Sequence, residues 1–503
     1  METNKVNEKI VFPTKFKLVS FYEDEWNNSK KVLLNLKSDF LNKDISLEDK
    51  FQKLSTVIQN FEKQNGNEDS KKDYLSNNCN NLKLAINSYF KNKPENFYLN
   101  ILPFIIEQCL LIEERAKNKY GEQTLPLMPS GKAMKESIPK ILFLSIISNT
   151  FFCNHKDFRN QINKKQAELT KINEWNIVNW YKLYNVNNRV ESYVATQRVI
   201  CLIAFFDFAQ RIIESKNNYF ESDIIVERIV FNPEDINKKL LECNDVFDEK
   251  DIFIHINDMD NPGITTQSIV NFANRNFQTG SIIPSCTQEE VLFNVRPELY
   301  TAMFICQRVY ENEIIIISNA YKLMENTGYL NSFKFKCLKE EIFTSNDYLK
   351  KDNSHVLCLD STFKEHYTFK SVLQDFSKFY IACDFCKKLN ENAGISTGSW
   401  GCGAFWCDKA HKFMQQIACA KCAGVKLSYS TFGDKNYKNK LEKLFNAVIK
   451  FTPKVSDLYK LIIEFKGTRD KEFHNYLKEK LGNEFNMDDN DIDDVIYKLF
   501  MNA

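Results

Sequence analysis

The stretch Ile269-Val270-Asn271-Phe272-Ala273-Asn274 begins with a short, mostly apolar run that predicts a buried strand over residues 269–272, followed by a loop. Similar β-branched runs occupy residues 224–231, 252–256, 314–317, 355–359 and 425–430. Helical patterns lie between several of these runs, at residues 297–310, 364–388, 409–422 and 438–451. Strands that alternate with helices indicate an α/β sheet covered on both faces.

The preceding half of the chain has a different pattern. Between about residues 16 and 215, apolar residues recur at spacings of three and four, and almost no run has strand character. This periodicity predicts helices, with a loop at the polar residues 65–81. Residues 141–153 and 199–213 are apolar stretches broken by polar side chains, so we expect them to form buried helices. The acidic residues 488–494 predict the start of a solvated helix.

Composition restricts the classes of function. Hydrophobic residues make up 43% of the 503 residues, enough for a sizeable core. Lys and Arg total 67 against 66 Asp and Glu, so we expect no direct binding of duplex DNA. Fifteen cysteines without a disulfide framework, and a polar start, favour a reducing intracellular compartment, cytoplasmic and/or nuclear. No apolar run reaches the roughly 18 residues of a membrane span, so no membrane partner is expected.

The sequence Gln288-Glu289-Glu290 follows the loop after the quoted strand and precedes an apolar stretch. Two carboxylates at a loop end suit glycoside chemistry, in which one acts as an acid and the other binds a sugar hydroxyl or stabilises positive charge. Crowding of two carboxylates raises the pKa of one of them, as an acid at neutral pH requires. Taken alone, however, the pair is better explained as the first turn of a helix, where Glu suits the helix dipole.

The surroundings of this pair change that interpretation. Five groups of residues follow one another: Phe272-Ala273-Asn274 with Gly280, seven residues and Gln288-Glu289-Glu290; Arg296-Pro297-Glu298-Leu299; Thr327-Gly328-Tyr329; Gly398-Ser399-Trp400-Gly401-Cys402-Gly403-Ala404-Phe405; and Thr431-Phe432-Gly433-Asp434. In order and spacing they resemble the signature of poly(ADP-ribose) glycohydrolases over about residues 223–465. Five ordered motifs are far more specific than any one of them.

The resemblance implies a macrodomain, a mixed sheet between helices, preceded by an all-helical accessory region. We place the accessory region at residues 1–130 and the catalytic domain at residues 131–503, with the macrodomain core at about 223–465. We expect hydrolysis of ribose–ribose bonds in poly(ADP-ribose) carried by modified proteins, without a metal or cofactor. The helical region is expected to act as a regulatory lid or to dock protein partners.

The family's functional residues are carried over by their matching motifs. Glu290 would protonate the 2′-oxygen of the leaving ribose and then activate water, and Glu289 would hold the ribose hydroxyls. Tyr329 would cover the ligand, and Phe432 would stack near the adenine or ribose. The other expected substrate-binding residues are Asn274, Gly280 and Gln288, together with the diphosphate loop Gly401, Cys402, Gly403, Ala404 and Phe405. Asp260 is the nearest candidate for an adenine-binding acidic residue.

Departures from the family pattern fall within the same motifs. Gln278 and Thr279 replace the first two residues of a triple glycine, and side chains there restrict positive φ angles. The other departures are Asn271 for Asp, Ser399 for Asn, Arg296 for Asn and Asn326 for Tyr. Two functions therefore stay open: an active glycohydrolase with a divergent loop, and a degenerate macrodomain that reads ADP-ribose or serves as a scaffold.

Two Cys-x-x-Cys pairs, Cys383 with Cys386 and Cys419 with Cys422, raise the alternative of a zinc site. Both pairs lie in predicted helices, whereas structural zinc ligands usually come from loops or knuckles. Buried free cysteines are common in protein cores. We therefore expect these four thiols to pack between helices rather than to bind a metal.

Overall fold

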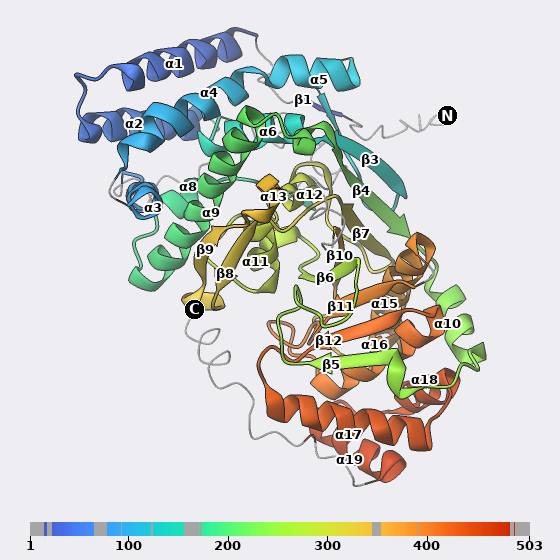
Figure 1. The fold of residues 1–503 in the computed structure, drawn as a ribbon. Helices are drawn as coiled ribbons and strands as arrows, with labels where there is room; N and C mark the ends of the chain where they lie inside the picture. Colours follow the sequence, from blue (N-terminus) through green and yellow to red (C-terminus); the bar gives the residue numbers. More distant parts are fainter. Residues whose placement is uncertain are drawn as a thin grey trace, which may run out of the picture. The chain divides into compact units, whose positions relative to one another are not determined.

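The structure is a computed structural model of the 503-residue chain, and Figure 1 labels its elements. It describes residues 15–17, 23–64, 78–91, 93–121, 124–154, 171, 174–344, 354–390, 392–482 and 487. Residues 488–494, and all but the last few of residues 65–81, lie outside this set, so those two expectations remain predictions. The chain divides into a first unit, Met1–Glu227, Arg275–Arg308 and Ile317–Lys350, and a second unit, Arg228–Asn274, Val309–Ile316 and Lys351–Ala503.

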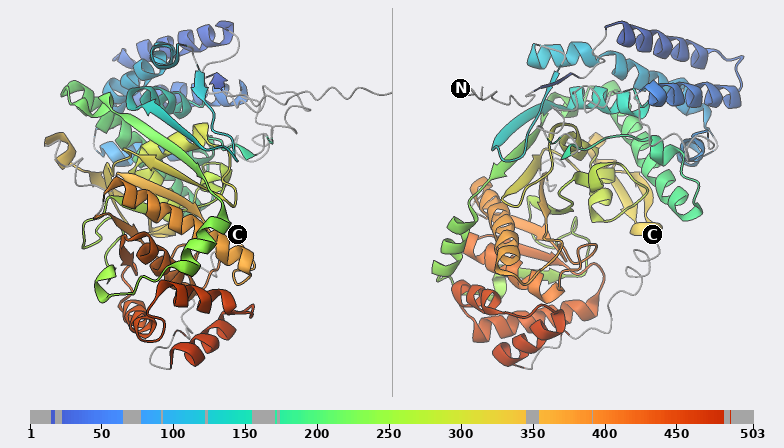
Figure 2. Two further views of the ribbon diagram at one scale, coloured as in Figure 1. Left: turned by 90° about the vertical axis from the view of Figure 1, so that its right-hand side faces the viewer. Right: turned by 180° about the vertical axis from the view of Figure 1, so that it is seen from behind.

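The first unit is mainly helical, as its periodicity predicts. Its longer helices are α1 (Glu23–Leu41), α2 (Leu47–Gln64), α3 (Asn80–Phe90), α4 (Leu102–Leu110), α5 (Ile112–Tyr120), α6 (Lys140–Phe151) and α9 (Arg189–Glu214). Its shorter ones are η2 (Phe97–Ile101), α8 (Tyr181–Tyr184), η5 (Asn218–Glu221), η7 (Phe277–Gly280), α11 (Gln288–Val295), η8 (Pro297–Leu299), α12 (Tyr300–Ile305), η9 (Leu330–Ser332) and α13 (Glu341–Thr344). Helices α1, α2 and α4 lie side by side in the views of Figures 1 and 2.

Helix α9 forms the core of this unit. Asn188 caps it, because its side-chain oxygen accepts a hydrogen bond from the Val190 amide at 3.0 Å. The helix is long and apolar enough to cross a membrane, yet 83% of its most apolar eighteen-residue stretch is buried within the protein. The expectation of buried helices at residues 141–153 and 199–213 is confirmed by α6 and α9.

The first unit also contains strands that the periodicity did not predict. Strand β1 (Lys15–Lys17) pairs with β2 (Thr124–Pro126), and β8 (Met324–Thr327) pairs with β9 (Lys334–Leu338), both antiparallel. Strand β3 (Met134–Pro139) is the edge of the large sheet. Only Ile138 in β3 is fully buried, and so its sequence lacks the apolar signal of a core strand.

The second unit is built around the central strands of the large sheet. The strand order is β3-β4-β7-β10-β6-β11-β12-β5. Here β4 is Asp223–Val230, β5 Ile252–His255, β6 Ser268–Ala273, β7 Glu313–Ser318, β10 His355–Asp360, β11 Gly394–Thr397 and β12 Lys426–Ser430. Strands β10, β6, β11, β12 and β5 run parallel, so their carboxyl ends meet at one edge. The six predicted strands are confirmed, whereas the short β11 was missed.

Helices α10 (Pro233–Glu242), α15 (Phe369–Leu389), α16 (Lys409–Ala423), α17 (Lys435–Phe451), α18 (Val455–Glu464) and α19 (Asp470–Leu481), with the short η6 (Glu249–Asp251), complete the second unit. Helix α15 packs on α16, and α17 packs on β5 and α19 (Figure 1). Thr368, Asp408 and Asp434 cap α15, α16 and α17. Both Cys-x-x-Cys pairs lie on helices, α15 and α16, as predicted.

One predicted helix is shorter than expected. The pattern at residues 297–310 predicted a single helix, but η8 and α12 end at Ile305. The chain then turns extended at Cys306, and the amide of Gln307 donates to the carbonyl of Met128 at 3.1 Å. Pairing with a segment almost 180 residues away therefore ends the helix, and local periodicity carries no information about that contact.

Candidate functional site

Glu289 and Glu290 lie in the first turn of α11 in the first unit, and both side chains are only 3% exposed. Thr287 is the N-cap, and its amide donates to Glu290 Oε2 at 2.8 Å. The Thr287 hydroxyl donates to the same oxygen. This reciprocal capping box fixes the Glu290 carboxylate relative to the helix start. The two glutamates thus form the first turn of a helix, as the simpler interpretation of the pair predicted. The same helix start also holds two buried carboxylates in place.

The loop before α11 holds the second carboxylate. The backbone amide of Gln278 donates to Glu289 Oε2 at 2.9 Å. Gln278, Thr279 and Gly280 all have left-handed backbone, with φ angles of 50°, 60° and 90°. The loop therefore adopts the conformation that favours glycine, although only its third residue is one. The positive φ angles are thus retained although residues 278 and 279 carry side chains.

Tyr329 lies near the same carboxylates within the first unit. It is half-buried, and its hydroxyl forms a hydrogen bond with the backbone of Gln288. Burial, followed by the nearby charge of Glu290, holds the pKa of Tyr329 well above its usual range. The first unit thus brings together five of the predicted residues: Gly280, Gln288, Glu289, Glu290 and Tyr329.

The second unit contains the expected diphosphate loop, residues 398–405, between β11 and α16. Trp400 anchors it, because its buried indole Nε1–H donates to the Leu359 carbonyl at 2.9 Å. The Lys412 ammonium lies over the same ring, 4.2 Å from its centroid. Within the described residues, the amides of Gly403, Ala404 and Phe405 donate to no protein acceptor. Backbone amides of this kind, in a small-residue turn, can bind an anion.

Gly401 is the loop position that requires glycine. Its φ angle is 76°, and a Cβ atom there would lie 2.5 Å from Ser361 Oγ. Gly403 has no such constraint, since a Cβ atom at that position would meet nothing within 4 Å. Of the two glycines, therefore, Gly401 sets the shape of the loop, and Gly403 leaves open space beside it.

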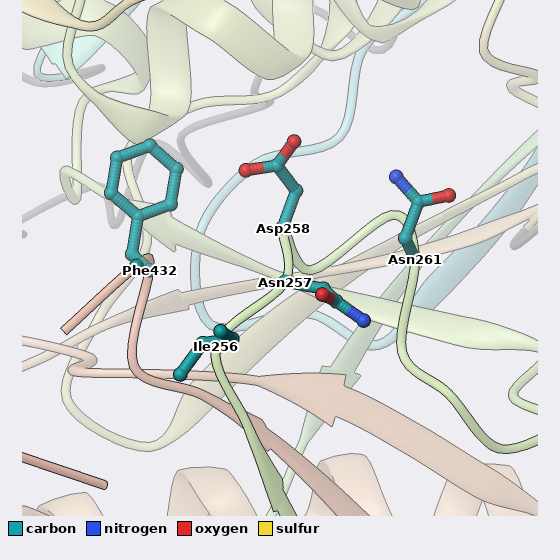
Figure 3. Close-up of a pocket in the computed structure, with 6 residues that line it drawn as sticks. Ile256, Asn257, Asp258, Asn261 and Phe432 are labelled. Atoms are coloured by element: carbon teal, nitrogen blue, oxygen red, sulfur yellow. The ribbon is translucent and has the colours of Figure 1, made fainter. Parts of the chain in front are cut away.

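A pocket of about 500 Å³ lies beside the Phe432 loop in the second unit. Figure 3 shows Phe432, Asp258 and Asn261 around it. Ile256, Asn257 and Gly433 complete its lining. Phe432 is 61% exposed and has a left-handed backbone, with φ 49°. An exposed aromatic ring beside carboxylate and amide groups is suited to stack on and hydrogen-bond a base.

The acidic side chain that lines this pocket is Asp258. The sequence pointed instead to Asp260, two residues later, which is not among the lining residues. Both lie in the loop after β5, where spacing alone does not distinguish them. The position after a parallel strand, beside the neighbouring strand β12, is shared by both residues. Only the tertiary structure shows that Asp258 lines the pocket.

Asn271 and Asn274 lie at different places along β6 and the loop after it. Asn271 is fully buried inside the sheet, opposite Cys358 of β10, and its amide donates to the Cys358 thiol at 3.6 Å. A neutral amide is less costly than a carboxylate at such a position. Asn274 follows the end of β6 at the carboxyl edge and is half-buried. The departure at 271 therefore affects the interior of the sheet.

The remaining departures are distributed over both units. The Ser399 hydroxyl hydrogen-bonds the buried Tyr429 and Tyr437 beside the diphosphate loop. Arg296 is buried at the end of α11, where its carbonyl accepts from the Leu299 amide at 3.0 Å. Asn326 lies in β8 and pairs with Phe335 of β9. The assignment of individual ligand contacts to these motif residues stays a prediction.

Comparison with known proteins agrees with this arrangement. Residues 247–439 match the family described as poly(ADP-ribose) glycohydrolase, macro domain fold, and residues 89–228 match its helical domain. The expected fold class, a helical region followed by a macrodomain with a mixed sheet, is confirmed by these two matches. The proposed boundary at residues 130/131 stays a prediction.

Individual relatives point the same way. Poly(ADP-ribose) glycohydrolase 1 of Caenorhabditis elegans is 26% identical over 272 residues, which cover 51% of this chain and 34% of that protein. Poly(ADP-ribose) glycohydrolase 2 of the same organism is 26% identical over 41% of this chain and 45% of its own length. The Arabidopsis thaliana poly(ADP-ribose) glycohydrolase 1 is 22% identical over 40% and 49%. The matched region thus spans a third to a half of these relatives. The chain belongs to the poly(ADP-ribose) glycohydrolase family.

Proposed function

We propose that this protein hydrolyses the ribose–ribose glycosidic bonds of poly(ADP-ribose) and releases ADP-ribose. One observation supports this most directly: two buried carboxylates that are adjacent in sequence are each held by a hydrogen bond, Glu290 by Thr287 and Glu289 by the Gln278 amide. The left-handed backbone at residues 278–280 survives the loss of two glycines. This backbone conformation supports the proposal that the divergent loop can still hold Glu289 in an active site.

In the proposed reaction Glu290 is the general acid and base. Its carboxylic acid gives a proton to the 2′-oxygen as the bond between that oxygen and the anomeric carbon of the next ribose breaks. The resulting Glu290 carboxylate then takes a proton from water, whose oxygen bonds to the anomeric carbon. Each cycle consumes one water molecule and returns Glu290 to its starting form. Glu289 would orient the ribose hydroxyls.

The remaining motif residues would hold ADP-ribose. The free amides of Gly403, Ala404 and Phe405 would bind the diphosphate. Phe432 would stack on the adenine or ribose, and Asp258 would accept a hydrogen bond from the base in the adjoining pocket. The substrate would be polymer on modified proteins in the cytoplasm or nucleus, with protein partners docking on the N-terminal helices.

Glu290→Gln tests this proposal directly. The amide oxygen can still accept from Thr287, so the helix cap is preserved while proton transfer is lost. Loss of general acid–base catalysis should lower the release of ADP-ribose from automodified polymer by about 100-fold to 10,000-fold. Glu191→Gln is the matched control, because Glu191 is also a first-turn glutamate in the first unit but is exposed.

ADP-ribose binding, measured by calorimetry, distinguishes the other outcomes. Wild-type release that disappears in Glu290→Gln and persists in Glu191→Gln establishes the glycohydrolase. Binding without release by the wild type would make the protein a reader of ADP-ribose. Neither binding nor release would leave a scaffold with an enzyme's fold.

A further inference from the structure

Arg198 is a fully buried guanidinium on α9, in the helical part of the first unit. Its Nη2 donates to Gln278 Oε1 at 2.6 Å and to the Tyr300 hydroxyl at 3.2 Å. Its Nη1 donates to the carbonyls of Ile283 and Ser285, the latter at 3.1 Å, and its Nε donates to Asn294 Oδ1 at 3.3 Å. These contacts use all five N–H donors of the side chain.

The acceptors are concentrated around the two glutamates. Gln278, Ile283 and Ser285 belong to the loop that precedes α11, and Asn294 lies on α11 itself. One rigid cation from α9 therefore holds the loop at three points and the helix at a fourth. The sequence separations, 80 to 96 residues for Gln278 and Asn294, explain why no local pattern indicated this role.

Gln278 connects this cation to the active carboxylates. Its side chain is fully buried and points to Arg198, while its backbone amide donates to Glu289 at 2.9 Å. The residue also has a left-handed backbone, a conformation that is unfavourable without glycine. A hydrogen bond to a buried charge is strong enough to offset that cost.

We propose that Arg198 and Gln278 form a positioning pair, in which a side-chain anchor replaces the conformational role of glycine and sets the loop that holds Glu289. This inference rests on the proposed glycohydrolase function and names a residue of the helical region as part of its support. It predicts that glycine at position 278, the residue of the family pattern, impairs the enzyme. If Gln278 were merely tolerated at this position, glycine would not impair the enzyme, because glycine removes the cost of the left-handed backbone.

The test compares Gln278→Gly with two matched variants. Thr279→Gly changes the neighbouring left-handed residue, which is exposed. Among the described residues its hydroxyl donates only to the adjacent Gln278 carbonyl, at 2.6 Å. Gln278→Glu keeps an acceptor for Arg198 and serves as the conservative rescue. For each variant, kcat and KM on automodified polymer are measured together with amide hydrogen exchange over residues 277–289.

Removal of a hydrogen bond to a buried charge should lower kcat of Gln278→Gly by about tenfold to 100-fold, with KM changed by less than about threefold. Exchange at residues 277–289 should be faster in Gln278→Gly, and also in Arg198→Lys, than in the wild type and in Thr279→Gly. Gln278→Glu should recover part of the kcat that Gln278→Gly loses, and Thr279→Gly should stay within about threefold of the wild-type kcat. If Gln278→Gly were as active as the wild type and its amide hydrogen exchange were unchanged, the proposal that Arg198 and Gln278 position the loop would be refuted.

The exchange measurement separates this inference from the proposed function. If the wild-type protein releases no ADP-ribose, the glycohydrolase proposal fails on its own. Faster exchange in Gln278→Gly and Arg198→Lys, but not in Thr279→Gly, would still support the positioning pair. Equal exchange in all variants would refute it whether or not the protein is an enzyme.

Discussion

Several residues in the loops of the candidate site carry backbone strain. Gln278, Thr279, Trp406 and Phe432 are not glycines, yet their φ angles lie between 49° and 60°. Such conformations persist only where the surrounding contacts hold them, and they are common at ligand-binding sites. Gln278 is held by Arg198, and the Phe432 amide donates to Ser430 Oγ at 3.1 Å.

Gly401 and Gly403 give a matched pair for the diphosphate loop. Gly401→Ala places a Cβ atom 2.5 Å from Ser361 Oγ at a φ of 76°. Strain and overlap together should lower the free energy of unfolding by about 2–4 kcal/mol. Gly403→Ala meets nothing within 4 Å and should change it by less than about 0.5 kcal/mol. Urea denaturation measures both, and equal values for the two variants would contradict the structure.

Phe432 should contribute to ligand affinity and not to folding. Its ring is 61% exposed beside the pocket, so Phe432→Ala removes little buried surface. Loss of stacking on adenine should weaken ADP-ribose binding by about tenfold, as calorimetry would show, with an unchanged melting temperature. Phe451→Ala, at another exposed phenylalanine of the second unit, is the control. A lowered melting temperature without weaker binding would exclude the stacking role.

Helices α15 and α16 support the diphosphate loop through buried charges. Lys412 of α16 pairs with Asp375 of α15, and both side chains are at most 1% exposed. Asp375 Oδ2 also accepts from the Thr362 hydroxyl at 2.9 Å. These hydrogen bonds satisfy a pair that would otherwise be costly to bury. The same Lys412 contacts Trp400, so the two helices and the loop form one packed element.

His411 on α16 makes the stability of the second unit sensitive to acid. Burial, followed by the opposing effect of Asp408 and smaller effects of Lys412, Asp375 and His366, lowers the pKa of His411 from 6.5 to about 3. The folded state then excludes a proton that the unfolded state binds. The free energy of unfolding is therefore not reduced by this group above pH 6.5, and it decreases as the pH falls from 6.5 toward 3.

His411→Gln should remove this dependence. Between pH 7 and pH 5 the wild type should lose about 2 kcal/mol more unfolding free energy than the variant. Glutamine retains a polar group near Gln415, whose Nε2 lies 3.2 Å from His411 Nε2. Urea denaturation at several pH values gives the difference. Parallel pH curves for the two proteins would show that folding does not lower the pKa of His411.

At the scale of the whole molecule, the reactivity of the cysteine thiols can be used to follow unfolding. All fifteen are free, eleven are buried, and burial raises the pKa of Cys109, Cys153, Cys286, Cys383 and Cys419 well above the usual range. Cys337 is exposed, and a hydrogen bond from Cys422 lowers the pKa of the half-buried Cys243. Thiolates are the reactive form.

Alkylation of the native protein should therefore modify Cys243 and Cys337 first, and the eleven buried thiols only after unfolding. Mass spectrometry of peptides after brief iodoacetamide treatment, with and without urea, measures the order. The Cys337→Ser protein should lose one fast site and leave the rate at Cys243 unchanged. Rapid native labelling of Cys383 or Cys419 would contradict the packing of α15 on α16.

The sequence alone determined much of this protein. Its periodicities separated the helical region from the α/β sheet and located six strands, because burial on one or both faces is recorded in local spacing. Its motifs identified the family and indicated Glu289, Glu290 and the loop at residues 401–405. Edge strand β3 and the hairpin of β8 and β9 were missed, since few of their residues are buried.

Only the tertiary structure decided where the departing residues lie and which partners they meet. Asn271 lies within the sheet, Asp258 instead of Asp260 lines the pocket, and Arg198 reaches Gln278 across 80 residues of chain. The physical reason is the same in each case. A backbone φ angle or a buried hydrogen bond depends on partners distant in sequence, and local spacing does not encode which partner a side chain meets.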